Sequence, residues 1–262
     1  MKPIPIYQVD AFTRGPFTGN PAAVCVLTEP VGEETMQKIA MENNLAETAF
    51  ITRGSDEWLI RWFTPVTEVD LCGHATLASA FVVLTILEPE SSEAVFRSRT
   101  MGTLTVRRKG ELLELDFPTD TLRECAVPDL IRESIGKVPM ESYMGRSDYL
   151  LLFSTETDIL EMDPDFRKLA TADGRGVIVT APGSDVDFVS RFFAPQAGID
   201  EDPVTGSAHT TLTPFWSVRL GKEKMTARQL SPRGGVLECT LGNGRTMIAG
   251  SATLYLKGEI YV

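Results

Sequence analysis

The chain has 262 residues, of which 43% are hydrophobic, 23% are charged and 8% are aromatic. This apolar fraction excludes wholesale disorder, and the length allows one large domain or two modest ones, at roughly 100–200 residues each. Asp and Glu number 36 against 25 Lys and Arg, a net charge of −11. Because nucleic acids and anionic membranes need a basic surface, we expect neither as a partner. A small anion remains compatible, since backbone N–H groups can bind it.

The cysteine and histidine counts limit metal and redox chemistry. Two histidines are too few for a zinc site built from several imidazoles, and no two of the four cysteines form a CxxC motif. Residues 1–5 lack the apolar stretch of a signal peptide, and the longest uncharged run, 71–87, is shorter than the ~20 residues that span a bilayer. We therefore expect a cytoplasmic protein with reduced thiols and no membrane segment.

Short apolar runs separated by turn residues predict a strand-rich first half. The segment 33–43 is predicted to be an amphipathic helix because it has an acidic first turn and one apolar face. The segment 75–87 is apolar on all sides, so we expect a helix enclosed by strands. The predicted strands span residues 4–12, 22–27, 48–52, 57–63, 94–98, 103–108 and 111–117.

The second half gives a similar pattern. Helices are predicted over residues 128–136, 164–172 and 207–220, and Pro214 is expected to kink or restart the last of them. The segment 140–149, like 14–20 in the first half, is expected to be a loop that helps define the substrate, although its residues have no readable chemistry. The predicted strands span residues 176–181, 187–193, 226–230, 236–241, 245–249 and 253–261.

The two halves share a sequence pattern at a fixed offset. Residues 61–65 read RWFTP and residues 191–195 read RFFAP, an offset of 191 − 61 = 130. In each half an acidic residue, a glycine and a predicted helix follow, at 70–75 and 202–208. A five-residue match alone can arise by chance, but the shared context favours an internal duplication. We place the boundary near residues 118–128.

The two predicted helix starts are candidate anion-binding sites. Gly73-His74 and Gly206-Ser207 lie where the first N–H groups of a helix lack intrahelical partners and carry the positive end of its dipole. Two such ends facing one another would bind a carboxylate without a lysine. The alternative, which periodicity alone favours, is that the glycines make tight turns and Ser207 is an N-cap.

Both histidines of the chain lie beside these helix starts, His74 in the first half and His209 in the second. An imidazole can shuttle protons or donate to a ligand oxygen, although a lone histidine is more often structural. Acidic residues flank the same segments, where they commonly cap helices. These acidic residues are Asp70, Glu201 and Asp202.

Two further side chains are candidates for proton transfer. Glu47 lies between a predicted helix and a predicted strand, so it is either a solvated edge residue or a general acid/base in a cleft. Cys72 is either a thiolate near a helix start or a small buried apolar residue. The phosphate-loop motifs GxGxxG and GxxxxGK[ST] and the nucleophile elbow GxSxG are absent, so nucleotide binding and hydrolase chemistry have no support.

These candidate residues lie within a series of specific sequence segments. The segments are residues 8–12 (QVDAF), 19–24 (GNPAAV), 44–48 (NLAET), 63–65 (FTP), 71–76 (LCGHAT) and 201–209 (EDPVTGSAH). In this order, and over most of the chain, they resemble the phenazine biosynthesis-like (PhzF-like) family of the diaminopimelate-epimerase-like superfamily. The resemblance implies an α+β fold with two pseudo-symmetric, strand-rich barrel halves, each around a central helix.

The resemblance also implies a domain division and a mechanism. The halves would be residues 1–118, completed by 250–262, and residues 119–249, with the active site in the cleft between them. Glu47 matches the family's general acid/base, which moves a proton between carbons of the substrate. His74, Asp202 and Ser207 match the polar groups around that transfer.

Other implied features concern binding. The amides of Gly73-His74 and Gly206-Ser207 match an anion site, and Asn20 matches a possible substrate contact. The family resemblance implies an isomerase with neither a metal nor an organic cofactor, acting on a small carboxylate-bearing substrate, and a homodimer.

One departure from the epimerase relatives bears on the chemistry. Those enzymes place a cysteine before each of the two glycines and use the pair as opposing bases. Here Cys72 fills the first position and Thr205 the second. We therefore favour a one-base proton shift through Glu47. The alternatives are an amino-acid racemase or epimerase that uses Cys72 as a base, and a binding or interaction protein without turnover.

Overall fold

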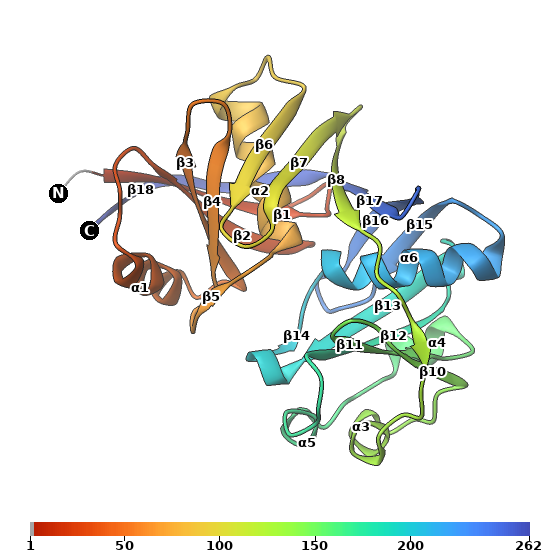
Figure 1. The fold of residues 1–262 in the computed structure, drawn as a ribbon. Coiled ribbons are helices and arrows are strands. Elements are labelled where there is room, and N and C mark those ends of the chain that lie inside the picture. Colours follow the sequence, from red (N-terminus) through yellow and green to blue (C-terminus); the bar gives the residue numbers. More distant parts are fainter. Residues whose placement is uncertain (1–2) are drawn as a thin grey trace. The chain divides into compact units, whose positions relative to one another are not determined.

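The computed structural model of the protein describes residues 3–262 and divides into two compact units (Figure 1). The first unit comprises the described residues up to Asp116 together with Ala249–Val262. The second unit comprises Phe117–Ile248. Among residues 3–262, no helix is both long and apolar enough to cross a membrane.

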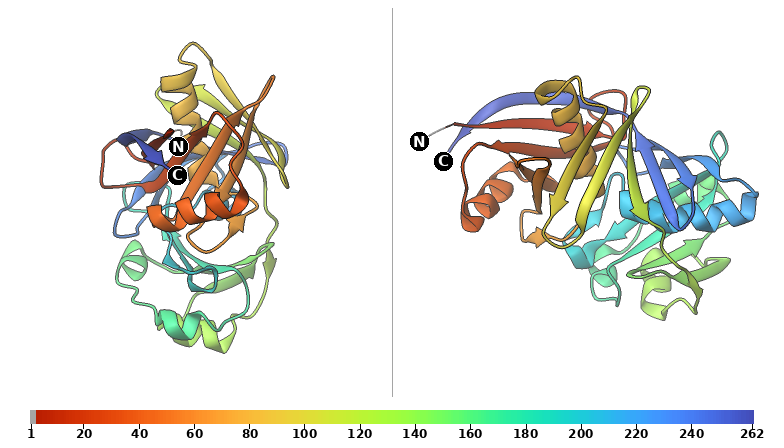
Figure 2. Two further views of the ribbon diagram at one scale, coloured as in Figure 1. Left: turned by 90° about the vertical axis from the view of Figure 1, so that its left-hand side faces the viewer. Right: turned by 45° about the horizontal axis from the view of Figure 1, so that its top comes forward.

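The first unit is a strand-rich layer wrapped around one helix. Its strands are β1 (Pro3–Ala11), β2 (Asn20–Leu27), β3 (Glu47–Arg53), β4 (Trp58–Phe63), β5 (Glu68–Val69), β6 (Glu93–Ser98), β7 (Gly102–Lys109), β8 (Leu112–Pro118) and β18 (Ala252–Tyr261). Its helices are α1 (Glu33–Asn43) and α2 (Gly73–Val82), the latter followed by a π-helical turn at Val83–Leu87. β1 pairs antiparallel with both β2 and β18, and the ends of β1 and β18 lie side by side (Figure 2).

Helix α2 is the enclosed helix that the sequence predicts. Eight of its ten residues are buried, and it packs against β1, β2, β3, β7 and β18. The α-helix ends at Val82 because the next turn opens to a π-helix, in which the Glu88 N–H donates to the Val83 carbonyl at 2.7 Å. The Arg108 side chain donates to the Leu84 carbonyl in that turn. The predicted range of 75–87 therefore covers two kinds of helix.

The second unit repeats the topology of the first. β11 and β12 are parallel, β12 and β13 antiparallel, β13 and β15 parallel, and β15 and β16 antiparallel. The pairs β2–β3, β3–β4, β4–β6 and β6–β7 have the same sequence of orientations. The pseudo-symmetric halves expected from the sequence are thus confirmed in the strand order.

The elements of the second unit are as follows. Its strands are β9 (Arg123–Glu124), β10 (Glu141–Met144), β11 (Asp148–Leu152), β12 (Gly176–Pro182), β13 (Phe188–Ala194), β14 (Ile199–Glu201), β15 (Lys224–Gln229), β16 (Gly235–Leu241) and β17 (Arg245–Gly250). Its helices are α3 (Asp129–Ile135), α4 (Glu156–Leu160), α5 (Phe166–Leu169), α6 (Gly206–Leu220) and a 3₁₀ turn at Pro195–Ala197.

Two predictions for this half are wrong in detail, and one further helix was not predicted. The expected loop at 140–149 contains β10 and the start of β11, and β11 was missed because its continuous apolar run has no alternation. The expected helix at 164–172 is one short turn, α5, after which the Thr171 hydroxyl donates to the Lys168 carbonyl. Helix α4 was not predicted; it begins with a capping box between Thr155 and Asp158.

Pro214 neither breaks nor restarts α6, which is continuous over its 15 residues. A proline has no N–H to donate to the carbonyl four residues earlier, here Thr210. The Asp120 N–H donates to that carbonyl instead, at 3.2 Å. An external donor therefore satisfies the group that the proline leaves without its helical partner.

The repeated RWFTP and RFFAP segments build the same ion pair in each unit. Arg61 donates Nε and Nη2 to the two oxygens of Glu68, both at 2.7 Å. Arg191 donates the same two groups to Glu201, at 2.7 and 2.9 Å. The predicted correspondence of Asp70 with Asp202 is replaced by this correspondence of Glu68 with Glu201, and Asp70 is exposed.

The two ion pairs differ in burial, which gives a matched test. The Arg191 and Glu201 side chains are 10% and 13% exposed, and Arg191 Nη1 also donates to the carbonyls of Ile159 and Met162. Arg191→Met should lower the free energy of unfolding by about 3–5 kcal/mol, because it leaves a buried carboxylate unpaired. Arg61→Met, in the more exposed pair, should lower it by about 1 kcal/mol. Urea titrations of both variants measure the free energy of unfolding. Equal losses in the two variants would contradict the stronger contribution expected of the more buried ion pair.

Candidate active site

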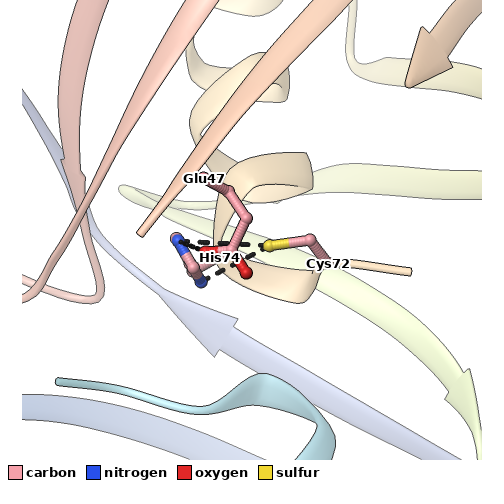
Figure 3. Close-up of side chains that lie close together, drawn as sticks. All are labelled: Glu47, Cys72 and His74. Carbon is pink, nitrogen blue, oxygen red and sulfur yellow. Dashed lines mark hydrogen bonds and ion pairs between the residues drawn. The ribbon is translucent and has the colours of Figure 1, made fainter. Parts of the chain in front are cut away.

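Three titratable side chains meet at the N-terminal end of α2 (Figure 3). Cys72 is the N-cap of this helix, His74 is its second residue, and Glu47 is the first residue of β3. His74 Nε2 lies 3.1 Å from Glu47 Oε2, and His74 Nδ1 lies 3.5 Å from Cys72 Sγ. The structure therefore brings together two predicted catalytic residues, Glu47 and His74, with the cysteine whose role was left open.

Asn20 fixes the orientation of the imidazole. It is the first residue of β2 and is fully buried, and its side-chain amide lies 3.0 Å from His74 Nδ1. β2 and β3 are parallel, with Ala22 opposite Glu47, so both strands begin beside the start of α2. The sequence predicted Asn20 as a substrate contact; here its amide holds the histidine ring.

Burial and charge set the protonation of this cluster. The side chains of His74 and Glu47 are 4% and 12% exposed. Burial opposes the charged imidazolium, but Cys72 and Glu47 outweigh it and raise the pKa of His74 well above 6.5. Burial, with the Glu47 charge, raises the pKa of Cys72 to about 11, so the thiol stays protonated near neutral pH. Glu47 is therefore the partner whose charge stabilises the imidazolium.

One carboxylate oxygen of the cluster is available for chemistry. Glu47 Oε2 is buried and accepts no hydrogen bond of good geometry from the described residues; its approach to His74 Nε2 is a close ion-pair contact. The carboxylate oxygen, the thiol sulfur and an imidazole nitrogen all lie within 4.8 Å of one another. This spacing suits proton exchange, and the three atoms are also potential metal ligands.

The N-terminus of α2 adds hydrogen-bond donors. The Cys72 side chain does not cap the helix, and the Thr76 hydroxyl bonds within the helix, to the Cys72 carbonyl at 2.5 Å. The first-turn N–H groups at Gly73 and His74 therefore have no side-chain cap, and they carry the positive end of the helix dipole. Such groups can stabilise an anion.

The second unit has a corresponding polar network at the start of α6. Thr205 is the N-cap of α6, as Cys72 is of α2, but its hydroxyl donates to Asp202 Oδ2 at 2.5 Å. Gln229 is fully buried, accepts from the Thr205 N–H at 2.9 Å and donates to the Asp202 carbonyl at 2.7 Å. Gln229 thus fixes the loop that carries Asp202. No sequence pattern distinguishes Gln229, because it lies inside an ordinary strand pattern.

Arg175 is a second residue that the sequence did not reveal. Its guanidinium donates to both carboxylate oxygens of Asp148 and, at 3.0 Å, to the hydroxyl oxygen of Ser207. Ser207 lies in the first turn of α6 beside Gly206. Because its oxygen accepts from a cation, the Ser207 hydroxyl is polarised as a donor. Arg175 lies in a short loop rich in glycine, where nothing in the pattern distinguishes it from a solvated arginine.

His209 belongs to the core of the second unit. It is fully buried, its Nδ1 lies 2.8 Å from the Thr205 carbonyl, and its ring is 6.0 Å from that of Phe188. Burial lowers the pKa of His209 to about 4, so the ring is neutral near pH 7. Of the two histidines predicted to mark the site, His74 contacts other candidate residues, which supports the prediction for His74. His209 instead packs in the core of the second unit.

Comparison with known proteins agrees with this fold. A solved structure of a probable proline racemase from Agrobacterium radiobacter covers 99% of the chain with a TM-score of 0.66 at 10% identity, and 93% of that protein is covered, which shows a common fold. The fold is therefore that of the diaminopimelate-epimerase-like class, as the sequence predicted.

The family follows from closer relatives. The phenazine biosynthesis-like family matches residues 9–258. A Pseudomonas aeruginosa protein described as an uncharacterized isomerase is 47% identical over 98% of both chains. The crystal structure of a phenazine biosynthesis protein of the PhzF family from Enterococcus faecalis covers 100% of both chains with a TM-score of 0.96 and 45% identity. The chain belongs to the phenazine biosynthesis-like family.

The buried His209 predicts an acid-sensitive stability. Its folded-state pKa of about 4 lies below the value near 6.5 of an exposed imidazole, so the unfolded chain binds the proton more tightly. The contribution of His209 to the free energy of unfolding is complete above pH 6.5. It falls by about 3 kcal/mol in total as the pH is lowered from 6.5 to 4. His209→Phe and His209→Gln should each lose this part of the pH dependence. Urea unfolding at pH 7.5 and pH 4.5 tests it, and an unchanged dependence in both variants would contradict it.

Proposed function

We propose that the protein is an isomerase that moves a proton between carbons of a small carboxylate-bearing substrate, with Glu47 as the general acid/base. The observation that carries the proposal is the buried contact between Glu47 Oε2 and His74 Nε2, in which the carboxylate oxygen lacks a directed hydrogen bond. The relatives described as isomerases support the reaction class.

The proposed chemistry uses one carboxylate twice. Glu47 accepts a proton from one carbon of the substrate and returns it to another, so no net proton is consumed. His74 keeps the carboxylate oriented and, as an imidazolium, stabilises its ionised form. Removal of a proton next to a conjugated acid builds negative charge, which the N–H groups of Gly73 and His74 would stabilise as it develops.

The second unit is proposed to contribute binding and relay groups. Gly206 and the polarised hydroxyl of Ser207 are proposed to bind substrate oxygen atoms, and Asp202 to relay or tune a proton. The support is the ordered network of Arg175 on Ser207 and of Gln229 around Asp202. Such prepositioned donors need little reorganisation when charge appears.

The racemase alternative has less support. A thiol with a pKa of about 11 is mostly protonated at neutral pH and is a weak base in that form. The position that corresponds to Cys72 in the second unit is Thr205, whose hydroxyl already donates to Asp202. A binding protein without turnover remains the other alternative, and the exchange experiment below distinguishes it.

A cytoplasmic homodimer is part of the same proposal. The four cysteines are free thiols, which suits a reducing compartment. Phe17 is 70% exposed and lies 5.8 Å, edge to face, from the half-exposed ring of Tyr255 on β18, beside the exposed Leu254 and Leu256. An apolar patch of this kind is suited to contact with a second copy. Light scattering coupled to gel filtration would test the dimer in the wild type and in Phe17→Ser.

Glu47→Gln tests the general acid/base directly. When candidate carboxylates are incubated with the enzyme in D2O, deuterium incorporation should fall by about 10²–10⁴-fold in this variant, because the amide cannot accept the proton. Glu42→Gln, at an exposed glutamate in α1, is the matched control and should exchange at the wild-type rate.

Cys72→Ala separates the alternatives in the same experiment. Exchange that survives Cys72→Ala but not Glu47→Gln supports the one-base isomerase. Exchange lost in Cys72→Ala and kept in Glu47→Gln would overturn it in favour of the racemase. The absence of exchange with a broad panel of substrates would favour the binding protein.

Ser207→Ala tests the proposed binding role of α6. Loss of one hydrogen bond to the substrate should raise KM about 3- to 10-fold while kcat changes less, since about 0.5–1.5 kcal/mol of binding is removed. Ser217→Ala, near the other end of the same helix, is the control. Steady-state kinetics measure both, and a wild-type KM in Ser207→Ala would contradict the role.

A further inference from the structure

We propose that the cluster of Glu47, Cys72 and His74 is also a binding site for a thiophilic divalent cation, with Zn²⁺ the preferred ion. The three side chains offer a carboxylate oxygen, a sulfur and an imidazole nitrogen within 4.8 Å of one another. They come from two segments, the start of β3 and the start of α2, and point toward one another (Figure 3).

The contacts of Asn20 and Glu47 favour Nε2 of His74 as the ligand. The Asn20 amide lies 3.0 Å from Nδ1, and Glu47 Oε2 lies 3.1 Å from Nε2. Cys72 Sγ lies 3.5 Å from Nδ1 and 4.0 Å from Nε2. Around a tetrahedral zinc ion with bonds of about 2.0–2.3 Å, neighbouring ligand atoms lie about 3.3–3.8 Å apart. The two distances to Nε2 lie on either side of this range, so shifts of about half an ångström would complete the coordination.

The surroundings of the cluster match those of a built metal site. Glu47 Oε2 is buried without a directed hydrogen bond, so its lone pair is available to an ion. Asn20 is fully buried with its side-chain amide 3.0 Å from the far nitrogen, Nδ1; with the amide oxygen turned toward Nδ1 it would accept the ring N–H, as outer-sphere groups do for metal-bound histidines. The thiolate ligand forms when the ion displaces the Cys72 proton to solvent.

The donor set distinguishes among ions. One sulfur, one nitrogen and one carboxylate suit Zn²⁺, whereas Mg²⁺ and Ca²⁺ need six or more oxygen ligands. The thiolate and the carboxylate together balance the charge of a divalent ion. Three protein ligands leave the fourth position of a tetrahedron open to water or to an added ligand.

The ion and the transferred proton would compete for the same atoms. A metal on His74 Nε2 and Glu47 Oε2 occupies the carboxylate that the proposed function needs as a base, so Zn²⁺ should inhibit turnover. This inhibition rests on the proposed function, whereas the binding site itself does not. Metal binding is therefore measured without substrate, so that the metal site and the isomerase function can be disproved independently.

Co²⁺ provides the spectroscopic test. The full chain, reduced and freed of metal, should bind one equivalent of Co²⁺ with a thiolate-to-cobalt charge-transfer band in the near ultraviolet. Zn²⁺ should abolish the band and Mg²⁺ should not. Cys72→Ala should lose the band, and its Zn²⁺ affinity should fall by more than the roughly 10–100-fold that an outer-sphere substitution causes. Cys239→Ala removes a buried thiol of the second unit and should retain both.

Two further variants keep the test informative if Cys72→Ala is unstable. Glu47→Gln should weaken Zn²⁺ binding while keeping the cobalt–thiolate band, and Asn20→Ala should weaken it about 10–100-fold with the band retained. Failure of the wild-type chain to bind Co²⁺ stoichiometrically, or a band that survives in Cys72→Ala, would overturn the metal site. A chain that binds Co²⁺ through Cys72 but shows no deuterium exchange would overturn the isomerase and leave the metal site standing.

Discussion

The arrangement of the first unit depends on the burial of one apolar helix. α2 has no polar face, so it is stable only where strands cover it on all sides, and its N-terminal end is where its backbone donors remain uncapped. The starts of β2 and β3 lie beside that end. Asn20 and Glu47 are therefore placed by the same packing that buries Leu77 and Ala78 in the core, and the polar cluster needs no separate scaffold.

That burial also determines the electrostatics of the cluster. An isolated imidazole in such surroundings would be neutral, as His209 is in the second unit, where its close contacts are a backbone carbonyl and an aromatic ring. His74 differs because Cys72 and Glu47 lie beside it, the carboxylate at 3.1 Å, and together they raise its pKa. The pKa values of the two histidines are therefore shifted in opposite directions, although both lie near the starts of related helices.

The sequence predicted most of the fold and part of the site, for different reasons. Composition and periodicity identify α2 as enclosed, and the RWFTP repeat identifies the duplication, because both are local patterns. The residue resemblance places Glu47 and His74, and the structure brings them into contact. Arg175 and Gln229 were missed because their roles depend on contacts with Ser207 and Thr205, 32 and 24 residues away, which no local pattern records. The effect of Pro214 on α6 was not predictable for the same reason, since the Thr210 carbonyl that it leaves without a helical donor accepts from the distant Asp120 N–H.

The pairing of β1 with β18 has a consequence for how the chain folds. Ala11 is opposite Ala252, a separation of 252 − 11 = 241 residues, whereas the second unit is built from one continuous segment, Phe117–Ile248. Closing so long a loop is entropically unfavourable and slow compared with local contacts. During synthesis the edge of β1 therefore stays open while the whole second unit emerges and folds. The first unit begins earlier on the ribosome and is completed later, and until β18 arrives the open edge of β1 is exposed to misassociation.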